Sequence, residues 1–263
     1  MKQLAGRAAV VTGSTSGIGL AIARAFAAEG ANVMLNGLGD AAAIEKLRAG
    51  IERDHGVKAG FHGADMTRPA EIADLVAQAG KAFGRVDIVV NNAGIQHVSP
   101  VEEFPIEKWD AIIAIDLSSA FHTSRAALPG MKQNGWGRIV NIGSIHSLVG
   151  SAYKSAYAAA KHGLLGFTKA LALEVAEQGI TANVICPGYA GPTPIIELQI
   201  KDQSKAHGIP EENVIRDIIL AHQPTKQFVK LEEIAAFAVF LCTDAAASIS
   251  GAALPIDGAW TAR

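Results

Sequence analysis

Short apolar segments alternate with longer amphipathic segments along almost the whole chain. The longer segments place apolar residues at helical spacing, as in residues 68–83. The short segments are rich in Val and Ile, and they lie at 8–11, 32–35, 58–63, 87–90, 138–142, 182–185 and 253–256. Strands that are apolar on both faces are typical of a parallel sheet with helices on each side. The alternation therefore predicts an α/β fold, a doubly wound parallel sheet of the Rossmann type, as a single domain over residues 1–263.

The same pattern predicts where the helices lie and where the regularity stops. Helices are expected at 17–29, 40–55, 68–83, 109–133, 153–178 and 231–242. Asp40 is interpreted first as a helix N-cap and only second as a ribose ligand. A Pro- and Gly-rich stretch follows Cys186, with short helical patterns near 195–205 and 211–220. Folds of this class place a ligand beside such an insertion, so residues 188–228 are expected to form a small helical lid.

Composition excludes several classes of protein. The 263 residues are 49% hydrophobic and 18% charged, which excludes a disordered chain. The 23 basic and 25 acidic residues give a net charge of −2, which argues against a nucleic-acid-binding surface. Neither a signal peptide nor an apolar run long enough to span a membrane is found, so a cytoplasmic protein is expected. Cys186 and Cys242 are expected to be buried, and no metal-ligand spacing occurs.

A glycine-rich turn, Thr12-Gly13-Ser14-Thr15-Ser16-Gly17-Ile18-Gly19, joins the first strand to the first helix. Gly13 permits a sharp exit from the strand, Gly17 lets the backbone approach a pyrophosphate, and Gly19 lets the helix pack closely. The N-terminus of the helix offers free N–H groups and a partial positive charge to an anion. The turn therefore predicts a pyrophosphate-binding site.

Three motifs in order carry a family resemblance: the turn at 12–19, the sequence Asn91-Asn92-Ala93-Gly94, and the set Ser144, Tyr157 and Lys161. Over essentially the whole chain the sequence resembles the short-chain dehydrogenase/reductase family. The resemblance implies a nicotinamide dinucleotide cofactor, with Asp65 and Met66 beside the adenine ring. The cofactor-binding residues expected on this basis are Gly13, Thr15, Ser16, Gly17, Ile18, Gly19, Asn36, Asp65, Met66, Asn92, Ala93, Gly94, Tyr157, Lys161, Pro187, Gly188 and Thr193.

The residues around the expected ribose favour NAD over NADP. A 2′-phosphate needs cationic partners near the end of the second strand and in the glycine-rich turn. Residues 36–40 and 14–16 contain no Lys or Arg. The acidic residue that often grips the ribose is absent too, and Asn36 stands in its place.

Three side chains suit the interconversion of an alcohol and a ketone. Tyr157 and Lys161 share one face of a predicted helix. An ammonium group and a positive nicotinamide ring stabilise a phenolate, so the pKa of Tyr157 is expected to fall from the usual value of about 10. Tyr157 would then act as acid or base, and Ser144 would steady the oxyanion. Tyr153 is a second phenol, but no lysine follows it at helical spacing to activate it.

Asp116 departs from the family pattern, in which most members have Asn at this place in the long helix. That Asn helps to hold a water that links the lysine to solvent. Asp116 accepts hydrogen bonds but cannot donate them as an amide does, and it adds negative charge near Lys161. We expect the proton relay to survive this change, with Asp116 as a catalytic residue beside Ser144, Tyr157 and Lys161.

A second polar set is expected at the nicotinamide end of the site. One ammonium, one imidazole and two amides suit a small carboxylate better than a bulky apolar alcohol. Residues 94–98, 143–147, 153–157 and 198–200 carry Gln96, His146, Lys154 and Gln199, and these segments resemble those of the bacterial D-3-hydroxybutyrate dehydrogenases. This resemblance implies NAD-dependent oxidation of D-3-hydroxybutyrate to acetoacetate. Tyr189 and Trp260 fit the two aromatic places of that group, although residues 189–194 form a longer segment than usual. The expected substrate-binding residues are Gln96, Ser144, His146, Lys154, Tyr157, Tyr189, Gln199 and Trp260.

Other functions fit part of the same sequence pattern. A 3-ketoacyl carrier-protein reductase of the same fold would need NADPH and a basic patch for its carrier, and other NAD(P)-dependent hydroxy-acid or alcohol dehydrogenases share the motifs. A non-catalytic dinucleotide-sensing protein would have no need of Ser144, Tyr157 and Lys161. The resemblance also implies a homotetramer, built on the helices expected at 109–133 and 153–178 and on the last helix and strand.

Overall fold

The computed structural model describes residues 2–191, 193, 196–197, 200–201, 204–205 and 208–262. These residues form a seven-stranded parallel sheet with the order β3-β2-β1-β4-β5-β6-β7. The strands are β1 (Ala8–Val11), β2 (Asn32–Asn36), β3 (Ala59–His62), β4 (Ile88–Asn91), β5 (Gly137–Ile142), β6 (Ile180–Pro187) and β7 (Ala253–Ile256). The strand order reverses between β1 and β4, which confirms the predicted doubly wound α/β fold.

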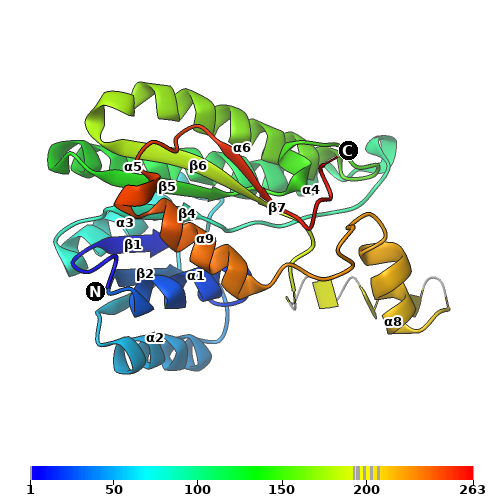
Figure 1. The fold of residues 1–263 in the computed structure, drawn as a ribbon, viewed down its shortest axis with the longest axis horizontal. Helices are drawn as coiled ribbons and strands as arrows, with labels where there is room; N and C mark the ends of the chain where they lie inside the picture. Colours follow the sequence, from blue (N-terminus) through cyan, green and yellow to red (C-terminus); the bar gives the residue numbers. More distant parts are fainter. Residues whose placement is uncertain are drawn as a thin grey trace.

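Helices cover both faces of this sheet, with α1, α2 and α9 on one face and α3, α5 and α6 on the other (Figure 1). Their bounds are α1 (Gly17–Ala28), α2 (Ala41–His55), α3 (Pro69–Phe83), α4 (Ile106–Ile113), α5 (Ser119–Asn134), α6 (Ser155–Glu174), α8 (Glu211–Val214) and α9 (Leu231–Leu241). Successive strand residues face opposite layers, so Val11 packs with α1 and α9 while Val10 packs with α3, α5 and α6. Burial on both faces explains why the strands are apolar throughout.

Two helices differ from the sequence prediction. The helix expected at 109–133 begins at Ile106 and is interrupted by a π-helical turn at Ala114–Ser118, which separates α4 from α5. The helix expected at 153–178 begins only at Ser155, because Tyr153 has a left-handed backbone with φ 64°. Hydrophobic periodicity does not reveal either feature, since an extra residue in one turn or one non-helical residue barely changes the pattern.

The segment that follows β6 projects beyond the carboxyl edge of the sheet (Figure 1). Its described part contains α8 and a π-helical turn at Ile215–Ile219. Ile200, Val214, Ile219 and Leu220 form a small apolar cluster that belongs to this segment. The helical pattern expected near 195–205 falls partly outside the described residues.

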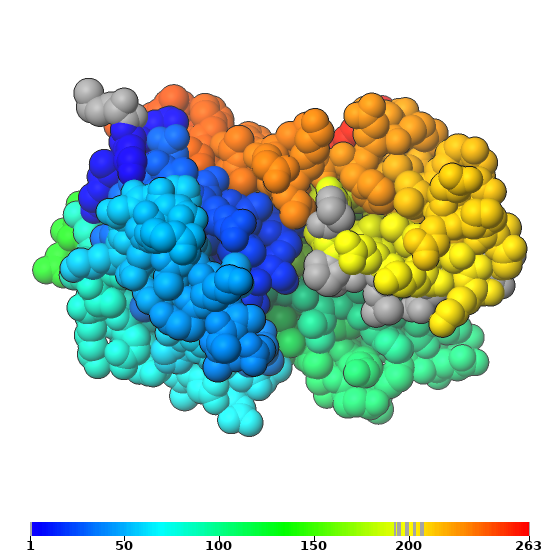
Figure 2. Space-filling model, turned by 90° about the horizontal axis from the view of Figure 1, so that it is seen from below, coloured from blue at the N-terminus to red at the C-terminus, as the bar shows by residue number. Residues whose placement is uncertain are grey.

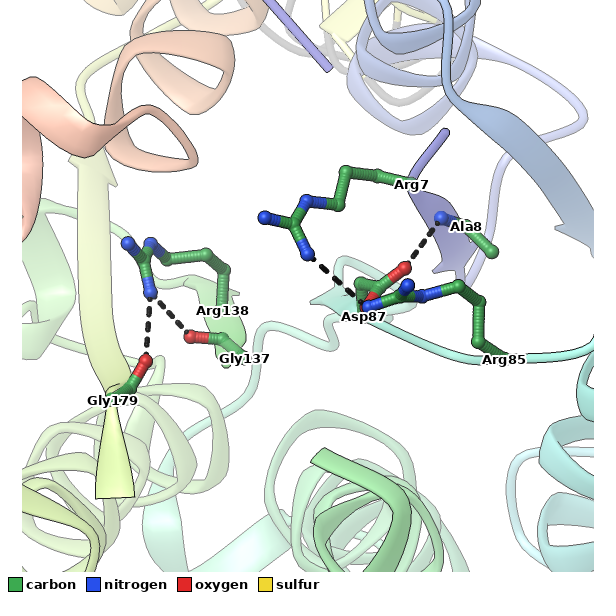
Figure 3. A network of polar contacts seen from close by, with 7 residues as sticks. All are labelled: Arg7, Ala8, Arg85, Asp87, Gly137, Arg138 and Gly179. Atoms are coloured by element: carbon green, nitrogen blue, oxygen red, sulfur yellow. Dashed lines mark hydrogen bonds and ion pairs between the residues drawn. The ribbon is translucent and has the colours of Figure 1, made fainter. Parts of the chain in front are cut away.

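A buried carboxylate closes the opposite, amino-terminal edge of the sheet (Figure 3). Asp87 Oδ2 accepts a hydrogen bond from the Ala8 N–H at 2.9 Å, and its other oxygen pairs with Arg85 and, at 3.7 Å, with Arg7. Beside it, Arg138 donates to carbonyls at the start of β5 and just before β6, at 2.8 and 3.1 Å. These contacts join β1 to β4 and β5 to β6 at one end of the sheet.

We expect Asp87→Asn to lower the free energy of unfolding by about 2 kcal/mol, because two arginines lose a buried ionic partner while the Ala8 N–H keeps an acceptor. Urea denaturation measures this. Asp54→Asn is the matched control, since it breaks an exposed pair with Arg53 and should cost about 0.5 kcal/mol or less. Equal losses for the two variants would contradict a structural role for Asp87.

Candidate active site

A pocket of about 470 Å³ lies at the carboxyl edge of the sheet, a size typical of ligand sites. In Figure 2 the blue N-terminal part and the yellow segment after β6 stand on opposite sides of a furrow in this region. Most residues expected from the sequence line the pocket: Gly13, Thr15, Ser16, Gly17, Ile18, Asn36, Asp65, Met66, Asn92, Ala93, Gly94, Gln96, Asp116, Ser144, His146, Lys154, Tyr157, Lys161, Pro187, Gly188, Tyr189 and Thr193.

The glycine-rich turn has the geometry expected of a pyrophosphate cradle. Gly13 and Gly17 have φ angles of 60° and 56°, which favour glycine. A Cβ on Gly13 would lie 2.9 Å from the Cα of Ala93, and a Cβ on Gly19 would collide with the Gly13 carbonyl. Helix α1 starts at Gly17, so its free N–H groups face the pocket. Gly19 itself does not line the pocket, and its lack of a side chain lets helix α1 pack closely against the Gly13 carbonyl.

The Asn91-Asn92-Ala93-Gly94 segment braces this turn. The Asn92 amide donates to the carbonyls of Thr12 and Gly13 at 2.9 and 3.0 Å. The Thr12 hydroxyl accepts from the N–H groups of Asn92 and Ala93 at 2.9 and 3.0 Å. These four bonds fix the end of β4 against the end of β1, so the two strands on either side of the switch point hold one cradle.

The expected ribose end of the pocket carries no described Lys or Arg. Asn36 is buried, and its side-chain amide already forms three hydrogen bonds. The amide accepts from the Gly13 N–H at 3.2 Å and donates to the His62 and Ala64 carbonyls, both at 3.0 Å. Asp40 lies outside the pocket and caps α2 by accepting from the Ala43 N–H at 2.7 Å, which confirms its interpretation as an N-cap.

The three candidate catalytic side chains, Ser144, Tyr157 and Lys161, line the same pocket. Ser144 follows β5, while Tyr157 and Lys161 come from consecutive turns of α6. The Lys161 ammonium lies 5.4 Å from the centre of the Tyr157 ring. It also lies 3.3 Å from the carboxylate of Asp116 and donates to the Ile142 carbonyl at 3.0 Å. The prediction that these groups share one site is thus supported by their positions.

Burial and neighbouring charges shift the pKa values of Tyr157 and Lys161. Burial raises the pKa of Tyr157; the Lys161 ammonium and a hydrogen bond with Ser144 oppose the rise, and the Asp116 carboxylate adds to it. The pKa of Tyr157 is therefore raised when the protein's own groups act alone. The lowered pKa expected from the sequence also included the effect of the positive nicotinamide ring. Burial also disfavours the charged form of Lys161, but Asp116 and Tyr157 outweigh it and raise the pKa of that ammonium. Lys161 accordingly stays charged.

The other end of the pocket holds a buried cation. Lys154 is 9% exposed, and burial lowers the pKa of its ammonium, which lies 5.9 Å from the centre of the Tyr189 ring. Within the described ranges no acidic side chain forms an ion pair with Lys154, whereas Lys161 is paired with Asp116. A buried ammonium that lacks a counter-charge is a strong site for an anion.

His146 forms a neutral wall next to this cation. Burial, with a further contribution from Lys154, lowers the pKa of His146 to about 4. Its ring packs edge to face against Tyr157 at 6.0 Å and against Trp260 at 6.3 Å. Charge at this end of the pocket therefore comes from Lys154 and not from the imidazole.

Two expected substrate residues are not placed in the pocket lining. Trp260 does not line the pocket, but its ring contacts the ring of His146, which does. Gln199 lies outside the described residues. The sequence patterns in turn missed several residues of the pocket wall, most of them small or apolar, which give no local signal because they resemble ordinary core positions. They are Gly37, Leu38, Ala64, Ile95, Ile115, Ile142, Gly143, Ile145, Ala190 and Ile196.

The described residues form neither a metal-binding cluster nor a membrane-spanning helix. The described part of the chain contains no group of three or more His, Cys, Asp or Glu that could hold a metal ion. None of the helices among the described residues is both long and apolar enough to cross a bilayer. Cys186 and Cys242 are buried and unpaired with each other, as expected.

Comparisons with known proteins agree with the geometry of the pocket. The family model for short chain dehydrogenases matches residues 7–204. The chain is 55% identical to D-beta-hydroxybutyrate dehydrogenase of Cupriavidus necator, and the match covers 99% of this chain and 100% of the relative. It is 54% identical to the protein of the same name from Rhizobium meliloti, and that match covers 98% of this chain and 99% of the relative. A crystal structure of a Sinorhizobium meliloti protein assigned to the short-chain alcohol dehydrogenases superposes with a TM-score of 0.88 at 36% identity, covering 99% of this chain and 98% of that one. The chain therefore belongs to the short chain dehydrogenase family, whose members are oxidoreductases that use a nicotinamide dinucleotide.

Proposed function

We propose that this protein oxidises D-3-hydroxybutyrate to acetoacetate, reversibly, with NAD as the hydride acceptor. The observation that carries the proposal is the buried Lys154 ammonium, which lies in the same pocket as Tyr157. A substrate carboxylate would supply the counter-charge that no described acidic residue provides. The names of the two relatives that are more than half identical agree with a small hydroxy acid as substrate.

The polar groups at that end would hold the two halves of the substrate. We infer that Lys154 and Gln96 bind the carboxylate, while Ser144 and Tyr157 bind the oxygen of the reacting carbon. Tyr189 would pack against the short carbon chain, since its ring lies beside Lys154. Trp260, whose ring packs against His146, and Gln199, which lies outside the described residues, are proposed as further substrate contacts on the basis of the resemblance.

Tyr157 would move the proton. In the oxidation it accepts the hydroxyl proton of the substrate, and in the reduction it returns a proton to the carbonyl oxygen. Ser144 would hold that oxygen in both directions, and Lys161 would stabilise the phenolate and bind the nicotinamide ribose. When bound, the nicotinamide accepts the hydride and adds a positive charge near Tyr157 that opposes the effect of burial on its pKa.

The groups at the adenosine end suit NAD. The pyrophosphate would lie on the N-terminus of α1 and in the cradle of Gly13 and Gly17. Leu38, which is 74% exposed, and the uncharged Thr15 and Ser16 offer no positive charge to a 2′-phosphate. A carrier-linked reductase that depends on NADPH is disfavoured for the same reason.

We expect Asp116→Asn to shift the pH profile of the oxidation. The Asp116 carboxylate adds to the rise in the pKa of Tyr157, so its removal should lower that pKa. Oxidation needs the phenolate, so the acidic limb of kcat against pH should move to lower pH. An unchanged limb would remove Asp116 from the relay.

The assembly of the protein is also proposed from the resemblance. Large apolar side chains are exposed on α5, α6 and α9, namely Phe121, Leu173 and Phe240. They are compatible with a homotetramer, which light scattering would test by the mass in solution. A cytoplasmic location stays a prediction of the sequence.

The direct test follows the near-ultraviolet absorbance of reduced nicotinamide in a mixture of the purified protein and D-3-hydroxybutyrate. We expect rapid reduction of NAD and kcat/KM at least about a hundredfold lower with NADP. Absence of turnover with intact NAD binding would favour the dinucleotide-sensing alternative. Preference for NADP would favour the reductase alternative.

A further inference from the structure

One of the three described non-glycine residues with a left-handed backbone stands directly before the pocket lysine. Tyr153 has φ 64°, and the other two are Lys226 and Ala259. Such a conformation is unfavourable for a bulky residue and persists only when its surroundings impose it. The Tyr153 side chain is 59% exposed, so burial of its ring does not explain the conformation.

A backbone hydrogen bond holds Tyr153 against another wall of the pocket. Its carbonyl accepts from the Ser99 N–H at 2.9 Å. Four residues earlier, the Ile95 N–H donates to the Asp116 carboxylate at 2.9 Å. Gln96 lines the pocket between these two attachments. The segment that carries Gln96 is therefore fixed at both ends, and one of the fixing points is Tyr153.

The left-handed residue also determines how Lys154 enters the pocket. Lys154 has φ −119° and ψ 36°, which is not helical, and α6 begins at the next residue, Ser155. The chain thus turns sharply at Tyr153, and the Lys154 side chain ends up nine-tenths buried in the pocket. With a φ of ordinary sign at Tyr153, the Lys154 backbone would leave in a different direction.

We propose that Tyr153 is a positioning residue for carboxylate recognition. Its left-handed backbone and its bond to Ser99 set the separation of Lys154 from Gln96, and so the selectivity for an acid over an uncharged substrate. The inference rests on the proposed function, because it assumes that these two side chains bind the substrate carboxylate. The Tyr153 phenol itself takes no part.

Substitutions at Tyr153 separate backbone from side chain. Gly and Asn tolerate the left-handed region, whereas Ile resists it and Pro forbids it. For Tyr153→Gly and Tyr153→Asn we expect parental KM values for D-3-hydroxybutyrate. For Tyr153→Pro we expect KM for D-3-hydroxybutyrate to rise about tenfold or more. For Tyr153→Ile we expect a smaller rise, and this variant replaces the proline variant in the experiment if the latter does not fold. In both, KM for the uncharged methyl ester should stay within about twofold of the parent.

Gly56→Ile is the matched control for strain elsewhere. Gly56 ends α2 with φ 69°, and a Cβ added there would meet no atom within 4 Å, so the variant strains the backbone outside the pocket without a steric clash. It should lower the melting temperature and leave KM unchanged. The proposal is overturned if Tyr153→Pro or Tyr153→Ile lowers stability alone, or raises KM for acid and ester equally.

Lys154→Met distinguishes this inference from the proposed function. If Lys154→Met leaves KM for the acid unchanged, the carboxylate site itself is wrong and the role of Tyr153 falls with it. If Lys154→Met raises KM and the strained Tyr153 variants do not, only the inference about Tyr153 fails.

Discussion

Tyr157→Phe is expected to lower kcat for D-3-hydroxybutyrate oxidation by about three orders of magnitude. The variant removes the hydroxyl that is proposed to exchange a proton with the substrate oxygen. The phenyl ring keeps its packing against His146 and its place 5.4 Å from the Lys161 ammonium, so the fold and the pocket shape should survive. NAD affinity, measured by calorimetry, should change little.

Tyr153→Phe is the control for this experiment. Tyr153 is an exposed phenol four residues earlier in the chain, and among the described residues no lysine ammonium lies over its ring, as Lys161 does for Tyr157. Its loss should leave kcat unchanged. A Tyr157→Phe protein that oxidised the substrate at the parental rate would show that proton transfer goes through another group.

The pH dependence of the parent protein follows from the same geometry. Burial raises the pKa of Tyr157, and the positive nicotinamide opposes this when it is bound. Oxidation uses the phenolate and should therefore speed up as the pH rises through that pKa. Reduction uses the phenol and should slow down over the same range.

Lys154→Met is expected to raise KM for D-3-hydroxybutyrate by about a hundredfold, because the substrate carboxylate would enter a buried site without a counter-charge. Methionine keeps the length and apolar packing of the lysine stem. The change in KM should be much smaller for the methyl ester. Equal KM values for parent and variant would remove Lys154 from substrate binding.

The same variant carries a second expectation that concerns stability. Lys154 is a buried ammonium, and within the described residues no carboxylate is ion-paired with it. Its replacement by an apolar side chain should therefore leave the free energy of unfolding unchanged or raise it by about 1 kcal/mol. Lost affinity together with kept or increased stability is typical of a residue retained for function.

The fold and the gathering of most candidate site residues in one pocket could be predicted from the sequence, the first from local patterns and the second with the help of the family motifs. Apolar strands, amphipathic helices and the glycine-rich turn are each visible within a few residues, and the carboxyl ends of parallel strands meet at one edge. That rule was enough to bring Gly13, Ser144 and Tyr157 into one pocket.

What the sequence did not predict depends on contacts between distant segments. The Asn36 amide is used for three hydrogen bonds to the turn and to the residues around β3, which no local pattern reveals. The sequence also contained no sign that burial raises the pKa of Tyr157, because burial depends on the packing of the whole pocket. The left-handed Tyr153 and the π-helical turn that carries Asp116 are single-residue deviations inside regular patterns.

We propose that the pocket selects a small hydroxy acid by pairing its carboxylate with Lys154 while Tyr157 exchanges the proton. Steady-state rates of NAD reduction with D-3-hydroxybutyrate and with its methyl ester, measured on the parent protein, show whether this selection exists. We predict a kcat/KM for the acid that is about a hundredfold higher than that for the ester. Equal values for the two substrates, or no turnover of the acid, would contradict it.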